Sequence, residues 1–192
     1  MERTNKDLLR RTAAGLFATE GYDAVGIQKI VDTAGVTKPT LYYYFKSKQG
    51  LLNAIFADHF DALLKGLEVA ASSYEGELMG VLTQVVDVYV RYGEEQREGT
   101  YLQLSMTYLP VSHGSSPIIQ TYMERLQGFF TDFFRKAVGE HGNLKGHEEV
   151  LAVTLIGLLN NYMIHLLNGK ISYSEAGIAA LVKQYMYGIY VL

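Results

Sequence analysis

A short segment near the N-terminus carries cations, hydroxyls and phenols at helical spacing. Within residues 37–46, TKPTLYYYFK, Leu41 and Phe45 lie four apart and can face inward together. The groups left to face outward or sideways suit a negatively charged surface, because ammonium and hydroxyl groups donate hydrogen bonds to phosphate oxygens and base edges. These outward residues are Thr37, Lys38, Thr40, Tyr42, Tyr43 and Lys46.

Two short helices joined by a tight turn are predicted to position these side chains. The first has one apolar face, formed by Ile27, Ile30, Val31 and Ala34. Gly35 ends it, since glycine readily adopts the left-handed conformation that closes a helix. Thr37 caps the second helix, and Pro39 lies in its first turn, where a missing N–H is tolerated. The arrangement is typical of a DNA-binding helix-turn-helix.

Each polar residue of this segment receives a predicted role toward DNA. Phosphate contacts are assigned to Thr37, Lys38, Tyr42, Lys46 and Lys48. Base contacts through hydroxyls or thymine methyl groups are assigned to Pro39, Thr40 and Tyr43. Gln28, at the start of the first short helix, is assigned to a phosphate or a base edge. The alternative for the tyrosines is simple packing, and Tyr44 is the one favoured for the core.

The run from residue 21 to residue 52 closely resembles the N-terminal DNA-binding domain of TetR-type bacterial transcription regulators. The matching pieces are Gly21-Tyr22, Ala34-Gly35-Val36-Thr37, Thr40-Leu41-Tyr42-Tyr43-Tyr44-Phe45, and Lys46-Ser47-Lys48 followed by Leu51-Leu52. Gly26 stands where that family usually has a Ser or Thr cap, so the first short helix should be capped less firmly. Tyr44 stands where His is frequent. Beyond residue 55, only length and helical periodicity agree with the family.

Charge is divided unevenly along the chain. The net charge is -3, from 17 Lys and Arg against 20 Asp and Glu. Residues 1–50 contain eight basic and five acidic residues, a balance of +3, whereas residues 51–192 contain nine and fifteen, a balance of -6. The basic part coincides with the helix-turn-helix, and phosphate contact requires only local positive charge.

Apolar periodicity predicts an all-α protein of two domains, a helix-turn-helix DNA-binding domain over residues 1–47 and a larger ligand-binding and dimerisation domain over residues 48–192. A long helix capped by Ser47 is predicted to join them. His59 on its apolar seam is interpreted as a buried or interface histidine. Further helices are predicted over residues 78–92, 100–109, 118–138, 148–167 and 174–192, with loops at 110–117 and 139–146.

The C-terminal part is rich in aromatic residues, for which two interpretations stay open. They can form an ordinary helical core, or they can line an apolar pocket with a few polar anchors. The resemblance implies an inducer-binding domain here, and favours a small, mostly apolar or aromatic ligand. The candidate ligand-binding residues are Tyr89, Tyr92, Tyr101, Met106, Tyr108, Phe129, Phe130, Phe133, Asn161, Tyr162 and His165.

Residues 151–167 contain no charged residue. This stretch is short for a membrane span and includes Asn160, Asn161 and His165, so a helix buried on two sides is favoured, with the core on one side and a partner on the other. It and the last helix could pack against their symmetry mates. The resemblance implies a homodimer formed in this way.

Other functional classes are disfavoured. The chain has no Cys and no motif for a nucleophile, a P-loop or a metal-dependent hydrolase, so we expect no enzyme, no cofactor and no metal. No signal peptide is visible, which favours the cytoplasm. The sequence therefore favours a repressor that ligand releases from an inverted-repeat operator in double-stranded DNA. The alternative is a ligand-independent or architectural DNA-binding protein of the same fold.

Overall fold

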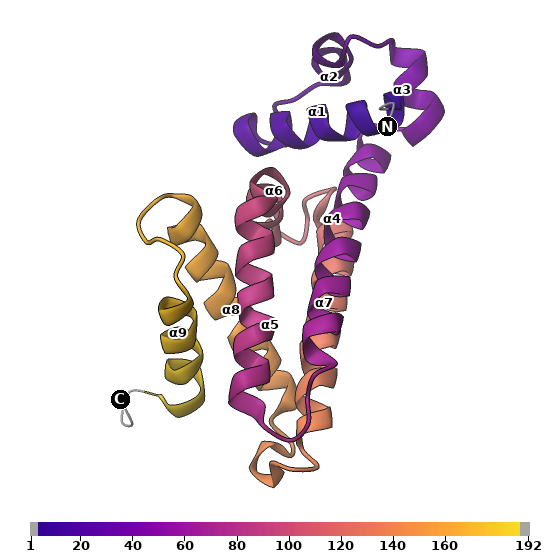
Figure 1. Cartoon of the computed structure of the whole chain (residues 1–192). Coiled ribbons are helices and arrows are strands. Elements are labelled where there is room, and N and C mark those ends of the chain that lie inside the picture. The colour runs from indigo at the N-terminus through magenta and orange to yellow at the C-terminus, as the bar shows by residue number, and fades with distance from the viewer. Residues whose placement is uncertain (1–3, 189–192) are drawn as a thin grey trace. The chain divides into compact units, whose positions relative to one another are not determined.

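The computed structural model describes residues 4–188, and this part of the chain contains helices and no strand (Figure 1). The helices are α1 (Asn5–Glu20), α2 (Ile27–Ala34), α3 (Lys38–Phe45), α4 (Lys48–Ala71), α5 (Leu78–Glu95), α6 (Arg97–Thr107), α7 (Ser116–Ala137), a 3-10 turn η1 (Gly142–Leu144), α8 (Glu148–Leu167) and α9 (Glu175–Tyr187). The predicted all-α class is confirmed. The predicted continuation of the last helix beyond residue 188 lies outside the described residues.

The chain divides into two compact units. The first comprises residues 1–60 and 96–123, and the second comprises residues 61–95 and 124–192. Helices α4 and α7 therefore each contribute to both units. The sequence predicted a different kind of boundary, after residue 47, between a DNA-binding domain and a ligand-binding and dimerisation domain. That division of function stays a prediction.

The helix ends around the turn between α2 and α3 follow the predicted local chemistry. Gly35 closes α2 in the left-handed conformation, with φ 65° and ψ 31°. Thr37 caps α3, because its Oγ1 accepts a hydrogen bond from the Thr40 amide at 3.4 Å. Gly26 provides no side-chain cap for α2. Ser47 Oγ accepts from the Gly50 amide at 2.9 Å, which confirms the predicted cap of α4.

Helix α1 packs against both α2 and α3 (Figure 1). Its buried stripe of Leu9, Ala13 and Phe17 is joined in the core by Ile30 of α2 and Leu41 of α3. Each large apolar side chain contributes about 1.5–3 kcal/mol to stability when fully buried. Helix α1 also packs against α6, so the first unit includes a segment distant in sequence.

A buried polar pair joins α4 to α6 inside the first unit. His59 and Gln103 are both buried, and His59 Nε2 lies 3.0 Å from Gln103 Oε1. Burial lowers the pKa of His59 to about 4, and the hydrogen bond to Gln103 opposes that shift only in part. The interpretation of His59 as a satisfied buried histidine is confirmed.

Acidification is expected to destabilise the protein through His59. Its pKa is about 4 in the folded chain and 6.5 ordinarily, so below pH 6.5 the unfolded chain binds a proton that the folded chain excludes. This contribution is complete above pH 6.5 and is lost as the pH falls toward 4, at a loss of about 2 kcal/mol by pH 5. Denaturant unfolding at pH 7 and pH 5 measures it. The variant H59Q should show a smaller drop, and an equal drop in both proteins would contradict the assignment.

Close packing against His59 explains a glycine in α6. A Cβ atom on Gly99 would lie 2.5 Å from His59 Nδ1, and the buried imidazole ring has little room to move. We therefore expect G99A to lower the free energy of unfolding by about 1–3 kcal/mol. Thermal unfolding measures this effect. The control is G128A in α7, where a Cβ meets no atom within 4 Å, and an equal effect of both substitutions would rule out the contact as the cause.

In the second unit, α5 packs against α8 and α9. Val81, Val85 and Tyr89 lie on the buried face of α5. The Tyr89 hydroxyl donates to Asn160 Oδ1 at 3.1 Å in this core. Buried polar groups thus have partners where α5 meets α8, as a stable helical core requires.

Helix α8 has one buried side and one exposed apolar side. By length and composition it is a helix that could cross a membrane, but core helices of soluble proteins meet the same criteria. Its buried side includes Leu155, Leu159 and Met163, whereas Val150 and Val153 are exposed. The structure therefore confirms one of the two predicted buried sides. The other side is exposed among residues 4–188, and its burial by a partner stays a prediction.

Candidate nucleic-acid interface

The outer face of α3 exposes aromatic side chains. Tyr43 is 72% exposed, Tyr42 is 45% exposed and Tyr44 is 37% exposed. The Tyr43 and Tyr44 rings meet edge to face, with 5.1 Å between their centroids. Tyr44 is the least exposed of the three, but it is not a core residue, contrary to the favoured expectation. Tyr42 and Tyr43 are accessible, as contact with a DNA groove requires.

The start of α3 presents the other predicted contacts. The hydroxyl groups of Thr37 and Thr40 form a hydrogen bond, with 2.9 Å between their oxygens. Each hydroxyl therefore has a partner in the absence of DNA. Lys38 and Pro39 are exposed beside them. Lys38 makes no hydrogen bond or ion pair with another residue of the part described, so its ammonium is free to meet a phosphate.

Lys46 ends α3 in a conformation that non-glycine residues seldom adopt, with φ 66°. Its Nζ donates to the Tyr43 carbonyl at 3.1 Å and lies 5.8 Å from the centroid of the Tyr43 ring. The backbone therefore places this cation beside the exposed tyrosine, on the same surface as the predicted phosphate contacts.

Lys48 differs from the other predicted phosphate ligands. Its Nζ donates to the Tyr22 carbonyl and lies 4.1 Å from the centroid of the Tyr22 ring and 5.7 Å from that of Phe17. Burial lowers its pKa, and nearby Asp23 opposes this shift. The ammonium thus fastens α4 to the turn after α1, and this geometry does not favour the predicted phosphate contact.

Gln28 is exposed on α2, and its Nε2 donates to Asp32 Oδ1 at 2.6 Å. To reach a phosphate or a base edge, its amide must first leave that carboxylate. Of the nine predicted DNA-binding residues, seven lie on or at the ends of α3, whereas Gln28 and Lys48 lie on neighbouring helices.

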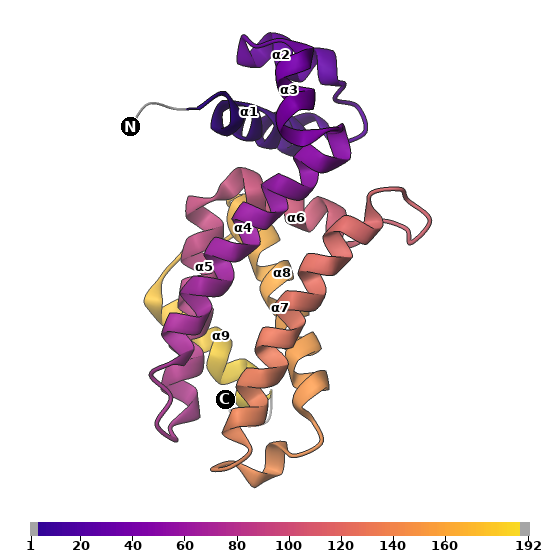
Figure 2. The same ribbon diagram turned by 90° about the vertical axis from the view of Figure 1, so that its right-hand side faces the viewer.

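The loop between α6 and α7, visible in Figure 2, contacts the segments that flank α2 and α3. His113 Nε2 lies 2.9 Å from Asp23 Oδ2, and Gln49 Nε2 donates to the Gly114 carbonyl at 3.3 Å. The loop therefore contacts both the turn before α2 and the start of α4. The sequence predicted a loop here, but its partner Asp23 lies 90 positions away, and no local pattern indicates that pairing.

The eleven predicted ligand-binding residues are divided between the two compact units. Tyr101, Met106 and Tyr108 belong to the first compact unit, and the other eight belong to the second. Asn161 and His165 are exposed on α8, while Tyr89 and Phe130 are packed in the core. Tyr92 and Tyr162 are half-buried.

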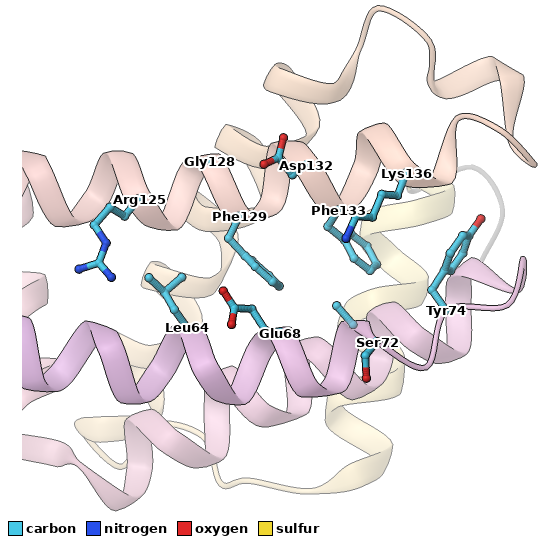
Figure 3. Close-up of a pocket in the computed structure, with 11 residues that line it drawn as sticks. Leu64, Glu68, Ser72, Tyr74, Arg125, Gly128, Phe129, Asp132, Phe133 and Lys136 are labelled. Atoms are coloured by element: carbon cyan, nitrogen blue, oxygen red, sulfur yellow. The ribbon is translucent and has the colours of Figure 1, made fainter.

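Phe129 and Phe133 line a pocket of about 530 Å³ in the second unit, between α4 and α7 (Figure 3). Leu64, Glu68 and Tyr74 also line it, and the prediction omitted them because nothing in the local sequence distinguishes these residues of a pocket wall from an ordinary helix surface or loop. Its volume lies within the range of small-molecule sites. In the described part of the chain, no group of three or more His, Cys, Asp or Glu residues could hold a metal ion.

Comparison with known proteins agrees with this fold. Residues 9–55 match the family of bacterial regulatory proteins called the tetR family. The HTH-type transcriptional activator FasR of Mycolicibacterium smegmatis is 26% identical over 147 residues, which are 76% of this chain and 64% of FasR. This chain thus spans less than two thirds of that relative.

Solved structures show the same fold. The fatty acid degradation regulator FadR of Bacillus halodurans superposes with a TM-score of 0.81 at 15% identity, over 98% of both chains. FadR of Bacillus subtilis, solved in complex with stearoyl-CoA, has a TM-score of 0.80 at 14% identity, over 95% of this chain and 98% of that one.

The fold and the exposed α3 surface define a helix-turn-helix protein. Over residues 9–55 the chain matches the tetR family of bacterial regulatory proteins, and its fold is similar to that of a solved regulator of that family.

Proposed function

We propose that this protein is a cytoplasmic transcriptional regulator that binds an inverted-repeat operator as a homodimer. The observation that carries the proposal is the exposed face of α3, on which Lys38, Lys46 and Tyr43 stand together above a buried core. Accessible cations and hydroxyls on a short, capped helix match the chemistry of the major groove. Two-fold symmetry of the protein requires two half-sites about one DNA turn apart.

The homodimer is proposed to form through α8 and α9. Val150, Val153 and Ile164 are exposed large apolar residues on α8. A second copy would cover them with the same surface, as two-fold contacts do. Dimerisation would bring two helix-turn-helix units to one operator.

Ligand control is proposed to act through the second unit. The pocket between α4 and α7 offers an apolar aromatic surface for a small ligand. FadR of Bacillus subtilis, solved in complex with stearoyl-CoA, supports a ligand with a long apolar part, because the stearoyl chain is apolar. Helix α4 continues from this unit into the one that carries α3. A ligand that binds better to one conformation shifts the population toward it, and the default expectation is release from DNA.

Selection of fragments from sheared genomic DNA at near-physiological salt tests the regulator. Purified protein should recover one or a few fragments that share an inverted repeat. Recovery of all fragments in proportion to length would instead support the alternative, a ligand-independent architectural DNA-binding protein. A reporter gene placed behind the selected operator then separates repression from activation, since FasR is named an activator.

A further inference from the structure

The pocket between α4 and α7 has an aromatic floor and an open side. Phe129 and Phe133 of α7 form most of the floor, and Leu64 of α4 closes it (Figure 3). Gly128 has no side chain to narrow the space, and Tyr74 borders it, with its ring 6.4 Å from that of Phe133. The lining along α7 extends from residue 125 to residue 136, about 16 Å of helix. An elongated apolar body fits this shape.

Four charged side chains line the pocket, and two of them are neutralised locally. Arg125 pairs with Asp61, with 2.7 Å between Arg125 Nη2 and Asp61 Oδ1. Asp132 pairs with Arg135 one turn along the same helix. These exposed pairs leave little net charge for a ligand to meet.

The two remaining charges, on Glu68 and Lys136, have opposite signs and no partner. Neither side chain makes a hydrogen bond or an ion pair with any residue between 4 and 188. Figure 3 shows both directed into the space between the helices, Glu68 beside Phe129 and Lys136 beside Phe133. The Tyr74 hydroxyl is buried without a hydrogen-bond partner among these residues. That hydroxyl points away from Phe129 in Figure 3, so it does not bear on the ligand. Glu68 and Lys136 are exposed at the open side of the pocket, where each can pair with a ligand group of opposite charge.

We propose that this pocket binds a zwitterionic amphiphile, a molecule with an amine, an acid group and an apolar body. The amine would face Glu68, the acid group would face Lys136, and the apolar body would lie on Phe129 and Phe133. A singly charged ligand satisfies one of the two charges and leaves the other unpaired. This inference rests on the proposed ligand control, for which it names the site and the chemical class.

Isothermal titration of the full chain with three probes of equal apolar length tests the charge requirement. The probes are N-dodecyl-N,N-dimethylglycine, dodecyltrimethylammonium and dodecanoate, each below its micelle-forming concentration. The zwitterion should bind more tightly than either singly charged probe, by roughly fivefold, because each exposed charge contact contributes at most about 1 kcal/mol. Equal affinities for all three would overturn the proposal.

Charge-removing variants assign the two contacts. E68Q should weaken binding of the zwitterion and of the cation by roughly fivefold, and it should leave binding of the anion unchanged. K136M should weaken binding of the zwitterion and of the anion, and it should leave binding of the cation unchanged. K65M is the matched control, because Lys65 is an exposed lysine of α4 that does not line the pocket. Unchanged zwitterion affinity in both E68Q and K136M would place the binding elsewhere and refute the site.

A separate measurement distinguishes failure of this inference from failure of the proposed function. Operator binding by the unmodified protein is measured with and without the zwitterion. Specific operator binding without any zwitterion binding would refute the pocket proposal and leave the regulator intact. Zwitterion binding with unchanged operator affinity would support the pocket and refute the ligand control proposed for it.

Discussion

The substitution V153D is expected to convert the protein from a dimer to a monomer while leaving each chain folded. Val153 lies on α8 and is 53% exposed in the single chain, so aspartate is tolerated there as long as no partner covers it. In the proposed dimer the carboxylate would be buried against a second apolar surface, at several kcal/mol. We therefore expect the dimer dissociation constant to rise by at least about a hundredfold. Sedimentation velocity over a range of concentrations measures the change.

The matched control for this substitution is V69D. Val69 lies on α4 and is 66% exposed, so the same change is made at similar exposure but outside the two C-terminal helices. V69D should remain dimeric and V153D should not, and operator affinity should fall only for V153D because a monomer reaches one half-site. A dimeric V153D protein with normal operator affinity would remove α8 from the interface.

Much of the first unit could be predicted because local chemistry determines it. Gly35, Thr37 and Ser47 act within three or four residues of their own positions, as left-handed closure and N-caps do. Helix α8 was also predicted with its bounds, since it has no charged residue from 151 to 167 and loops with glycines on both sides. In both cases the signal lies within the segment itself.

The predicted side-chain roles were less secure where distant partners intervene. Lys48 has the charge and spacing of a phosphate ligand, yet its ammonium contacts the ring and the carbonyl of Tyr22, a residue 26 positions earlier in the sequence. His113 was read only as part of a loop, and its contact with Asp23 emerges only from the fold. Neither contact has a sequence periodicity from which it could be inferred.

The aromatic residues of the C-terminal part show a different limit. A stripe of Tyr and Phe has the same helical spacing whether it fills a core or lines a cavity. Phe130 is fully buried and packed, whereas its neighbour Phe129 borders a pocket. The choice depends on small side chains nearby such as Gly128, and on the side chains that α4 presents opposite them. Sequence alone carries no record of that pairing.

The substitution K38A is expected to weaken DNA binding and flatten its salt dependence. Lys38 is exposed and unpaired among the described residues, so a phosphate contact would release about one counterion. The slope of log affinity against log salt should fall in magnitude by about 0.9, equally for all DNA sequences. K46A should do the same, although its ammonium must first leave the Tyr43 carbonyl. Fluorescence anisotropy with a labelled duplex at several salt concentrations measures both.

K48A serves as the internal comparison, because it removes the same charge from a position turned toward Tyr22 and Phe17. It should leave the salt slope unchanged and lower the melting temperature, since it removes contacts between a cation and aromatic rings worth about 0.5–2 kcal/mol. A reduced slope for K48A with an unchanged melting temperature would mean that the ammonium turns outward when DNA binds. An unchanged slope for K38A would remove the start of α3 from the phosphate contacts.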